Sequence, residues 1–184
     1  MSHPVVLVNE DDRPLGTADK LRAHAEGWLH RAFSVFIFDS TGRLLLQQRT
    51  DDKYHSGGLW SNTCCSHPRP GEAPIDGAHR RLPEELGFTA SLTPVFQDRY
   101  DLPVGEDLIE HEHNHTFVGT VNAPRIRPSA DEVSDWAWVS PSAVREDVAT
   151  HPHRYTAWFR HLLPSVLAAA PSASEDPSAS ASTA

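Results

Sequence analysis

The strongest constraint on the fold of this chain is the run Arg31–Phe38, whose sequence RAFSVFIF is rich in aromatic and β-branched residues. The residues Ser40-Thr41-Gly42 then form a typical turn sequence, and an apolar run resumes at Leu44-Leu45-Leu46. Two apolar runs on either side of a short turn predict a β-hairpin. We therefore expect a β-sheet in the centre of the fold.

Further strands and helices are expected on either side of this hairpin. The expected strands are Val5–Val8, Leu92–Tyr100, Leu108–Val121 and Asp135–Val139. The expected helices are Thr17–Ala25, a helix between Pro74 and Gly87, one capped by Ser140 and followed by Pro141, and Tyr155–Leu163. Proline suits a first helical turn, glycine suits the position after the last turn, and serine suits a helix cap. Strands interleaved with helices, without strict alternation, predict an α/β fold with a mixed β-sheet and helices on both faces.

The domain organisation follows from length and local composition. A chain of 184 residues suits one core, so residues 1–170 are expected to form a single domain. Residues 171–184 are almost entirely serine, alanine, proline and threonine, which predicts a disordered tail. Within the domain, residues 50–70 are polar and interrupted by glycine and proline, and a loop of that length is usually functional.

Composition disfavours several classes of protein. Apolar runs are shorter than the ~18–20 residues of a membrane-spanning helix, and we expect no secretory signal. The formal net charge of −9 disfavours nucleic acid and anionic membranes as partners and leaves a small-molecule substrate as the expected partner. The sequence does not predict an oligomeric state. The two adjacent cysteines cannot build a disulfide framework, which favours a reducing, cytoplasmic location.

The residues Cys65-Ser66-His67 lie within the long loop and are followed by Pro68. A thiol one residue from an imidazole can act as an acid, base or nucleophile beside a metal ligand. The alternative is a loop thiol without a role. If the backbone is extended, Cys64 points the other way and serves as a small buried apolar residue.

A second motif is the run EHEHNH, from Glu110 to His115. Side chains alternate on a strand, so Glu110 and Glu112 share one face, and His111, His113 and His115 share the other. Carboxylates suit Mg²⁺ or Mn²⁺ and three histidines suit Zn²⁺, so either face could hold a metal. The alternative is a solvated edge strand, although two carboxylates on one face repel each other unless a cation or proton intervenes.

Three weaker features involve metal-ligating or charged residues. His24 and His30 are six residues apart, so only a loop could bring them together. Glu84 and Glu85 oppose the helix dipole at their helix end, which indicates either a cation and phosphate site or a solvated helix end. The basic residues that would form a diphosphate pocket, if folding gathered them, are Lys20, Arg49, Lys53 and Arg81.

Together these residues resemble the type 1 isopentenyl-diphosphate isomerases, a branch of the Nudix superfamily, from about Val5 to Leu163. The stretches that carry the resemblance are LHRAFSVFIFD (29–39), LLLQQR (44–49), GLWSNTCCSHP (58–68), Glu110-x-Glu112, Asp131-Glu132-Val133 and Trp158. The resemblance implies a Nudix α/β/α sandwich. It also implies an isomerase of isoprenoid biosynthesis, which interconverts isopentenyl and dimethylallyl diphosphate by a metal-assisted 1,3 proton shift through a tertiary carbocation.

The general Nudix pattern, G-x5-E-x7-R-E-U-x-E-E-x-G-U, would span residues 66–88. The matching residues are Glu72, Arg80, Leu82, Glu84, Glu85 and Gly87, with Phe88 as an apolar stand-in. Ser66 replaces the first glycine, and Arg81 stands where the pattern has an acid of the magnesium cluster. The loss of that acid disfavours pyrophosphohydrolysis. Pro83 lies inside the expected helix and predicts a kink there.

The resemblance also implies residue roles. A divalent-metal site for Mn²⁺ or Mg²⁺, with Zn²⁺ as an alternative, would comprise His24, His30, His67, Glu110 and Glu112. The acid/base groups would be Cys65 and Glu112 with Tyr100 assisting, and Trp158 would face the carbocation. A second Mg²⁺, which grips the diphosphate, would bind to Glu85 and the backbone oxygen of Cys65. The diphosphate contacts would be Lys20, Arg49, Lys53, Ser66 and Arg81.

Two other functions remain open from the sequence. One is a Nudix hydrolase of a nucleoside or prenyl diphosphate, which would release phosphate or a monophosphate. The other is a catalytically inactive Nudix-like module that binds a metal or small ligand without turnover.

Overall fold

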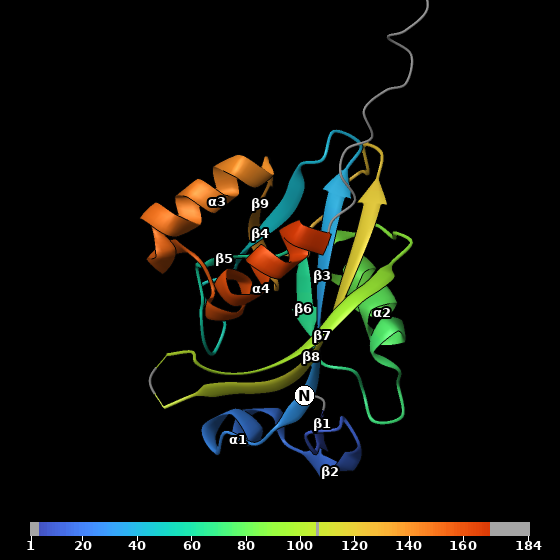
Figure 1. The fold of residues 1–184 in the computed structure, drawn as a ribbon, viewed down its shortest axis with the longest axis vertical. Helices are drawn as coiled ribbons and strands as arrows, with labels where there is room; N and C mark the ends of the chain where they lie inside the picture. The colour runs from blue at the N-terminus through green and yellow to red at the C-terminus, as the bar shows by residue number, and fades with distance from the viewer. Residues whose placement is uncertain (1–3, 106, 170–184) are drawn as a thin grey trace, which may run out of the picture.

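The structure is a computed structural model that describes residues 4–105 and 107–169, so the predicted tail at 171–184 lies outside the described residues. A mixed sheet forms the centre, with helices on both of its faces (Figure 1). Its strands are β1 (Val5–Val8), β2 (Pro14–Ala18), β3 (His30–Asp39), β4 (Leu44–Arg49), β5 (Trp60–Ser61), β6 (Cys64–Ser66), β7 (Thr93–Pro103), β8 (Ile109–Val121) and β9 (Val133–Val139). The helices are α1 (Lys20–Ala25), α2 (Pro74–Leu86), α3 (Pro141–Thr150) and α4 (Ala157–Ala169), with a 3₁₀ turn at Pro152–Arg154. Among the described residues, none of the helices has the length and apolarity needed to cross a membrane.

The predicted hairpin is confirmed as β3 and β4, which pair antiparallel at Phe38 and Leu44. Strand β3 has two further neighbours besides β4. It pairs antiparallel with β6 on one side and parallel with β8 on the other. The register of β3 with β6 and β8 therefore decides which side chains of these two strands lie next to each other.

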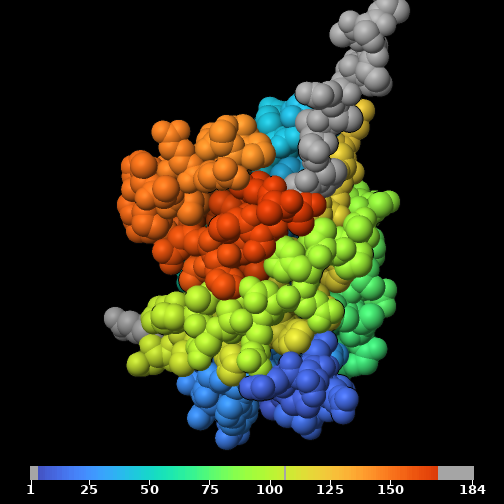
Figure 2. All heavy atoms as spheres, viewed as in Figure 1, coloured from blue at the N-terminus to red at the C-terminus, as the bar shows by residue number. Residues whose placement is uncertain are grey.

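The side chains of β3 alternate between two cores, one on each face of the sheet. Phe36 and Phe38 pack in the core beneath α3 and α4. Phe33, Val35 and Ile37 pack in the core against α2. The predicted arrangement of a mixed sheet between two helical layers is therefore confirmed. In the view of Figure 2, β7 separates the C-terminal helices from the N-terminal segment.

Helix α2 begins and ends where the sequence predicts. Pro74 occupies the first turn, and Gly87 ends the helix with a left-handed φ of 75°. The kink at Pro83 stays a prediction, and α2 continues through this residue to Leu86. Gly77 allows the close approach of α2 to the sheet, since a Cβ atom at this position would lie 2.8 Å from the Phe33 ring.

Three boundaries differ from the sequence predictions. The start of the expected helix 17–25 is wrong, because residues 17 and 18 belong to the edge strand Pro14–Ala18, which pairs with β1. Helix α1 begins only at Lys20, where the Asp19 side chain accepts a hydrogen bond from the Arg22 amide at 3.0 Å. The expected loop at 50–70 contains the short strands β5 and β6, whose pairing partners lie far away in the sequence. The final helix begins at Ala157 and is longer than expected.

Candidate active site

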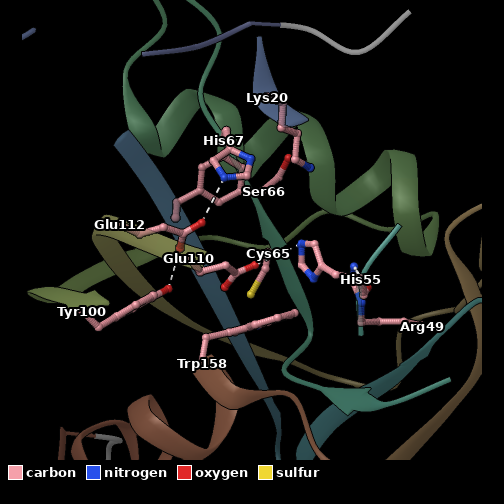
Figure 3. Close-up of a pocket in the computed structure, with 11 residues that line it drawn as sticks. Lys20, Arg49, His55, Cys65, Ser66, His67, Tyr100, Glu110, Glu112 and Trp158 are labelled. Atoms are coloured by element: carbon pink, nitrogen blue, oxygen red, sulfur yellow. Dashed lines mark hydrogen bonds and ion pairs between the residues drawn. The ribbon is translucent and has the colours of Figure 1, made fainter. Parts of the chain in front are cut away.

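Strand register gathers the expected acid/base residues beneath one face of the sheet. The parallel pairing of β3 with β8 places His30 opposite Glu112, and the antiparallel pairing of β7 with β8 places Tyr100 opposite the same Glu112. Strand β6 places Cys65 opposite Ser34 of β3. Of these residues, Cys65, Tyr100 and Glu112 line one pocket (Figure 3). The residues that line it are Lys20, Phe33, Arg49, His55, Cys65, Ser66, His67, Tyr100, Glu110, Glu112 and Trp158.

Three histidines converge on Glu112. Nε2 of His67 lies 3.0 Å from Oε1 of Glu112, and Nε2 of His30 lies 3.6 Å from the same oxygen. The two Nε2 atoms are 3.2 Å apart. The His24 ring centroid lies 4.8 Å from that of His30, so the α1–β3 connection brings this pair together. All four residues offer ligand atoms within 4.8 Å of one another.

In His24 and His30, the Nδ1 atom already forms a hydrogen bond with a backbone carbonyl oxygen. Nδ1 of His24 lies 2.7 Å from the Lys20 carbonyl oxygen, and Nδ1 of His30 lies 2.8 Å from that of Trp28. An imidazole that donates from Nδ1 to a carbonyl leaves the Nε2 lone pair free, as metal-ligating histidines do. Burial lowers the pKa of His24 to about 4, which keeps it neutral and able to ligate. The donor set therefore fits a divalent cation.

The partner of Glu110 is a residue that the sequence analysis missed. Oε1 of Glu110 lies 3.4 Å from Nε2 of His55, a buried side chain. With His24, these two residues form a second group whose ligand atoms lie within 4.8 Å of one another. His55 also meets the Trp158 ring edge-on, with 5.9 Å between the centroids. The only sequence signal was that His55 falls in the loop expected to be functional.

Glu110 and Glu112 differ in how readily their carboxyl groups ionise in this pocket. Burial, followed by the nearby Glu112 carboxylate, raises the pKa of Glu110 well above its ordinary value. Burial opposes the ionisation of Glu112 as well, but the His30 and His67 side chains beside its carboxylate hold its pKa well below the ordinary value. A proton on Glu110 therefore relieves the repulsion that the sequence predicts between the two carboxylates.

The Cys65 thiol is held inside the pocket by two polar side chains. Sγ donates to Oδ1 of Asn62 at 2.9 Å and lies 3.3 Å from Oγ of Ser34. Burial raises the pKa of Cys65 to about 12, so the thiol carries its proton at neutral pH. Cys64 is fully buried in the core against α2. The prediction that the two cysteines point to opposite faces is confirmed.

Tyr100 and Trp158 complete the inner wall. The Tyr100 hydroxyl donates to Oε2 of Glu112 at 2.6 Å. Trp158, from α4, is 2% exposed, and the Arg49 guanidinium lies 5.2 Å from its ring centroid. A proton donor, a carboxylate with a tyrosine partner, and an aromatic ring thus surround one buried space.

Comparisons with known proteins show the family to which this chain belongs. The NUDIX domain family matches residues 28–159. A Burkholderia multivorans protein named isopentenyl-diphosphate Delta-isomerase is 51% identical over 163 residues, which cover 89% of this chain and 92% of that protein. This chain belongs to the isopentenyl-diphosphate isomerase family of Nudix proteins. A Streptomyces avermitilis protein of the same name is 51% identical over 160 residues, covering 85% of this chain and 80% of the relative.

Solved structures confirm the Nudix fold of this family member. DR0079 from Deinococcus radiodurans has a TM-score of 0.74 at 16% identity, covering 89% of this chain and 98% of that one. The MutT protein from Methanosarcina mazei has a TM-score of 0.58 at 18% identity, covering 74% of this chain and 91% of that one. At these identities, the likeness concerns the fold alone.

The diphosphate contacts expected of the isomerase family lie in three places. Lys20, Arg49 and Ser66 line the pocket, and burial followed by the Arg49 charge lowers the pKa of Lys20. Arg81 lines an adjoining cleft that shares Lys20 and Ser66 with the pocket. Lys53 does not line either cavity and forms an ion pair with Glu132.

The two adjacent acids near the end of the Nudix helix, Glu84 and Glu85, do not line this pocket. Oε1 of Glu85 contacts the Arg81 guanidinium at 2.7 Å, and Oε2 accepts from Gln47 at 3.0 Å. Glu85 is buried on α2 and is not among the residues that line the pocket. Glu84 pairs with Arg81 at 2.8 Å and is 42% exposed, which favours the solvated helix end for that residue.

Proposed function

We propose that this chain interconverts isopentenyl diphosphate and dimethylallyl diphosphate by a 1,3 proton shift. The observation that supports this most strongly is that a protonated thiol, Cys65, shares one buried pocket with the hydrogen-bonded pair of Tyr100 and Glu112. Two acid/base groups that enter a pocket from different strands suit a reaction that adds one proton and removes another. The curated relatives bear the name of this activity.

The proposed reaction balances without a co-reactant. One group gives a proton to the terminal CH₂ of the alkene, which creates a tertiary carbocation. The other group takes a proton from C2, and the C–H electron pair becomes the new double bond. We assign the two steps to Cys65 and Glu112, with the Tyr100 hydroxyl moving a proton at Oε2 of Glu112. One group ends protonated and the other deprotonated, so both exchange protons with solvent before the next turnover.

The proposed cofactor is a divalent cation at the histidine and glutamate cluster. The proposed ligands are His24, His30, His67, Glu110 and Glu112, which offer three imidazoles and two carboxylates. This set suits Mn²⁺ or Mg²⁺, with Zn²⁺ as the alternative. A bound cation would supply positive charge that fixes the carboxylates and offsets their repulsion.

The remaining walls suit the rest of the substrate. The Trp158 ring can stabilise a carbocation through its π face, which is worth ~0.5–2 kcal/mol. Lys20, Arg49 and Ser66 are the proposed diphosphate contacts at the pocket mouth, with Arg81 in the adjoining cleft and Lys53 as an outer contact. The diphosphate itself would position the alkene for proton transfer. A diphosphate-bound Mg²⁺ remains part of the proposal, and Glu85 would exchange its ion pair with Arg81 for that cation.

The hydrolase alternative is disfavoured by the contacts of Arg81. This residue occupies the position of an acid in the Nudix pattern, and its guanidinium contacts both Glu84 and Glu85. A cation in place of a carboxylate weakens a magnesium cluster of the hydrolase type.

We also propose a cytoplasmic location, which the two free thiols support.

The experiment that tests the proposal follows isopentenyl diphosphate with Mg²⁺ by ¹H and ³¹P NMR. An isomerase produces dimethyl vinyl signals while both phosphates stay attached. Release of a monophosphate or inorganic phosphate would favour the hydrolase. An unchanged spectrum with folded, metal-loaded protein would favour the inactive module.

A further inference from the structure

The outer face of β8 has a histidine cluster that the proposed function does not use. His113 and His115 lie on this face, with 5.6 Å between their ring centroids. Asp12, in the turn between β1 and β2, accepts from Nε2 of His115 at Oδ2, over 2.9 Å. One ligand atom from each of the three residues lies within 4.8 Å of the others. Two imidazoles and a carboxylate thus converge from separate parts of the chain.

The hydrogen bonds of His113 leave one nitrogen free to ligate. Nε2 lies 3.1 Å from Oε1 of Gln97, an acceptor, so it carries the proton. Nδ1 then carries the lone pair, and this buried atom has no hydrogen-bond partner among the described residues. A buried polar atom without a partner is costly. A histidine that donates from one nitrogen to an oxygen and offers the other is the arrangement of a metal ligand.

The Asp12 carboxylate is held in place before any ligand arrives. Nε of Arg31 donates to Oδ1 at 2.7 Å, which leaves Oδ2 as the oxygen that faces the histidines. The Asn9 side chain accepts from the backbone amides of Asp11 and Arg13 at 3.1 and 2.9 Å, which fixes the turn. Arg31 adds a positive charge nearby, but it contacts the carboxylate oxygen that the site does not need.

We propose that Asp12, His113 and His115 form a binding site for a borderline transition metal, Zn²⁺ in the first instance. Zn²⁺ prefers imidazole and carboxylate ligands in a tetrahedral arrangement, and three protein ligands leave the fourth position for water. The bound ion ties the β1–β2 turn to β8. This site lies across β8 from Glu110 and Glu112, so it does not depend on the proposed function.

The test uses the full chain, stripped of metal, and Zn²⁺ alone as the probe. Equilibrium dialysis should show two ions per chain, one in the pocket and one on the outer face. His113→Gln with His115→Gln should lower the number to one, and either single substitution should weaken the outer site by roughly tenfold or more. The matched control is His111→Gln, which lies on the same face outside the cluster and should keep both ions.

A reciprocal variant separates the two sites. Glu112→Gln with His67→Ala should lose the pocket ion and keep the outer one, whose removal then requires the His113 and His115 substitutions. The outer ion should also raise the melting temperature of this variant when Zn²⁺ is added. The proposal is overturned if the doubly substituted, folded His113 and His115 variant binds as much Zn²⁺ as the unmodified chain. It is also overturned if the pocket variant binds none.

Discussion

The Tyr100 hydroxyl donates a hydrogen bond to Oε2 of Glu112 at 2.6 Å, and both residues are buried. The antiparallel register of β7 and β8 sets this contact by placing the two residues directly opposite each other. The other oxygen of the same carboxylate faces His67. Glu112 therefore joins the metal-ligating side of the pocket to its proton-transfer side.

Removal of the Tyr100 hydroxyl should impair turnover more than stability. Tyr100→Phe should lower kcat by ~10–100-fold, because the substitution removes a group that orients Glu112. A donor to a carboxylate lowers its pKa, so the pKa of Glu112 should rise and the acidic limb of the kcat profile should move to higher pH. Steady-state kinetics across pH measure both effects. Tyr155→Phe, whose hydroxyl contacts Asp147 outside the pocket, is the control; equal losses in both variants would contradict this role.

The two adjacent cysteines should respond differently to substitution. Cys65→Ala removes the thiol that lines the pocket and should lower kcat by ~10²–10⁴-fold. Cys64→Ala removes a side chain from the core against α2, so kcat should stay near the unmodified value while stability falls by about 1 kcal/mol. Steady-state kinetics measure kcat, and urea unfolding measures the free energy of unfolding, for both variants. A similar loss of kcat in the two variants would refute the assignment of Cys65.

His55 should affect metal binding through Glu110. His55→Ala leaves the Glu110 carboxylate without its partner at 3.4 Å, so the Kd for Mn²⁺ should rise roughly tenfold. His55→Gln keeps a donor and should lose less. Calorimetric titration of metal-free protein provides the measurement. His151→Ala removes a histidine paired with Asp147 outside the pocket and should leave the Kd unchanged; no difference between His55→Ala and this control would remove His55 from the site.

The contact between Glu72 and Arg80 should stabilise the fold in a pH-dependent way. Arg80 donates to both oxygens of Glu72, at 2.8 and 2.9 Å, and these hydrogen bonds lower the pKa of Glu72 from 4.5 to about 2. A lowered pKa in the folded state stabilises the protein above pH 4.5, and this contribution is lost as the pH falls toward 2.

Glu72→Gln should therefore cost about 1 kcal/mol at pH 7 and less at pH 3. Urea unfolding of the variant and the unmodified chain at both pH values measures the difference. A penalty that grows on acidification would contradict the ion-pair explanation. Glu146→Gln, an exposed glutamate on α3, should show no comparable pH dependence.

Strand alternation and helix-end residues are signals within a short stretch of sequence, and they predicted the corresponding features of the fold. The alternation on β8 correctly placed Glu110 and Glu112 on one face, which the structure shows to be buried, and Gly87 correctly marked the end of α2. Strand β6 has three residues, too few for a periodic signal, and its pairing with β3 depends on the tertiary fold. Pro83 lies inside α2, which continues to Leu86, and Leu82 and Leu86 pack in the core on this face of the sheet.

Some site residues were predicted from the sequence and others were not, because contacts between distant segments depend on the tertiary fold. The resemblance identified His24, His30 and His67, which the structure gathers around Glu112. His55 lies in a loop without periodicity, so the sequence could not show that its ring turns toward Glu110. The position of Glu85 was predicted from its motif, yet its direction depends on Arg81, the residue that departs from that motif.

The most direct test of the central claim is the fate of solvent hydrogen during turnover. Isopentenyl diphosphate is incubated with the folded, metal-loaded chain in D₂O and followed by ¹H and ²H NMR. Because the alkene takes its new proton from an exchangeable group, dimethylallyl diphosphate should form with deuterium in a methyl group, and Cys65→Ala should not form it. A folded, metal-loaded chain that leaves the spectrum of isopentenyl diphosphate unchanged would contradict the account.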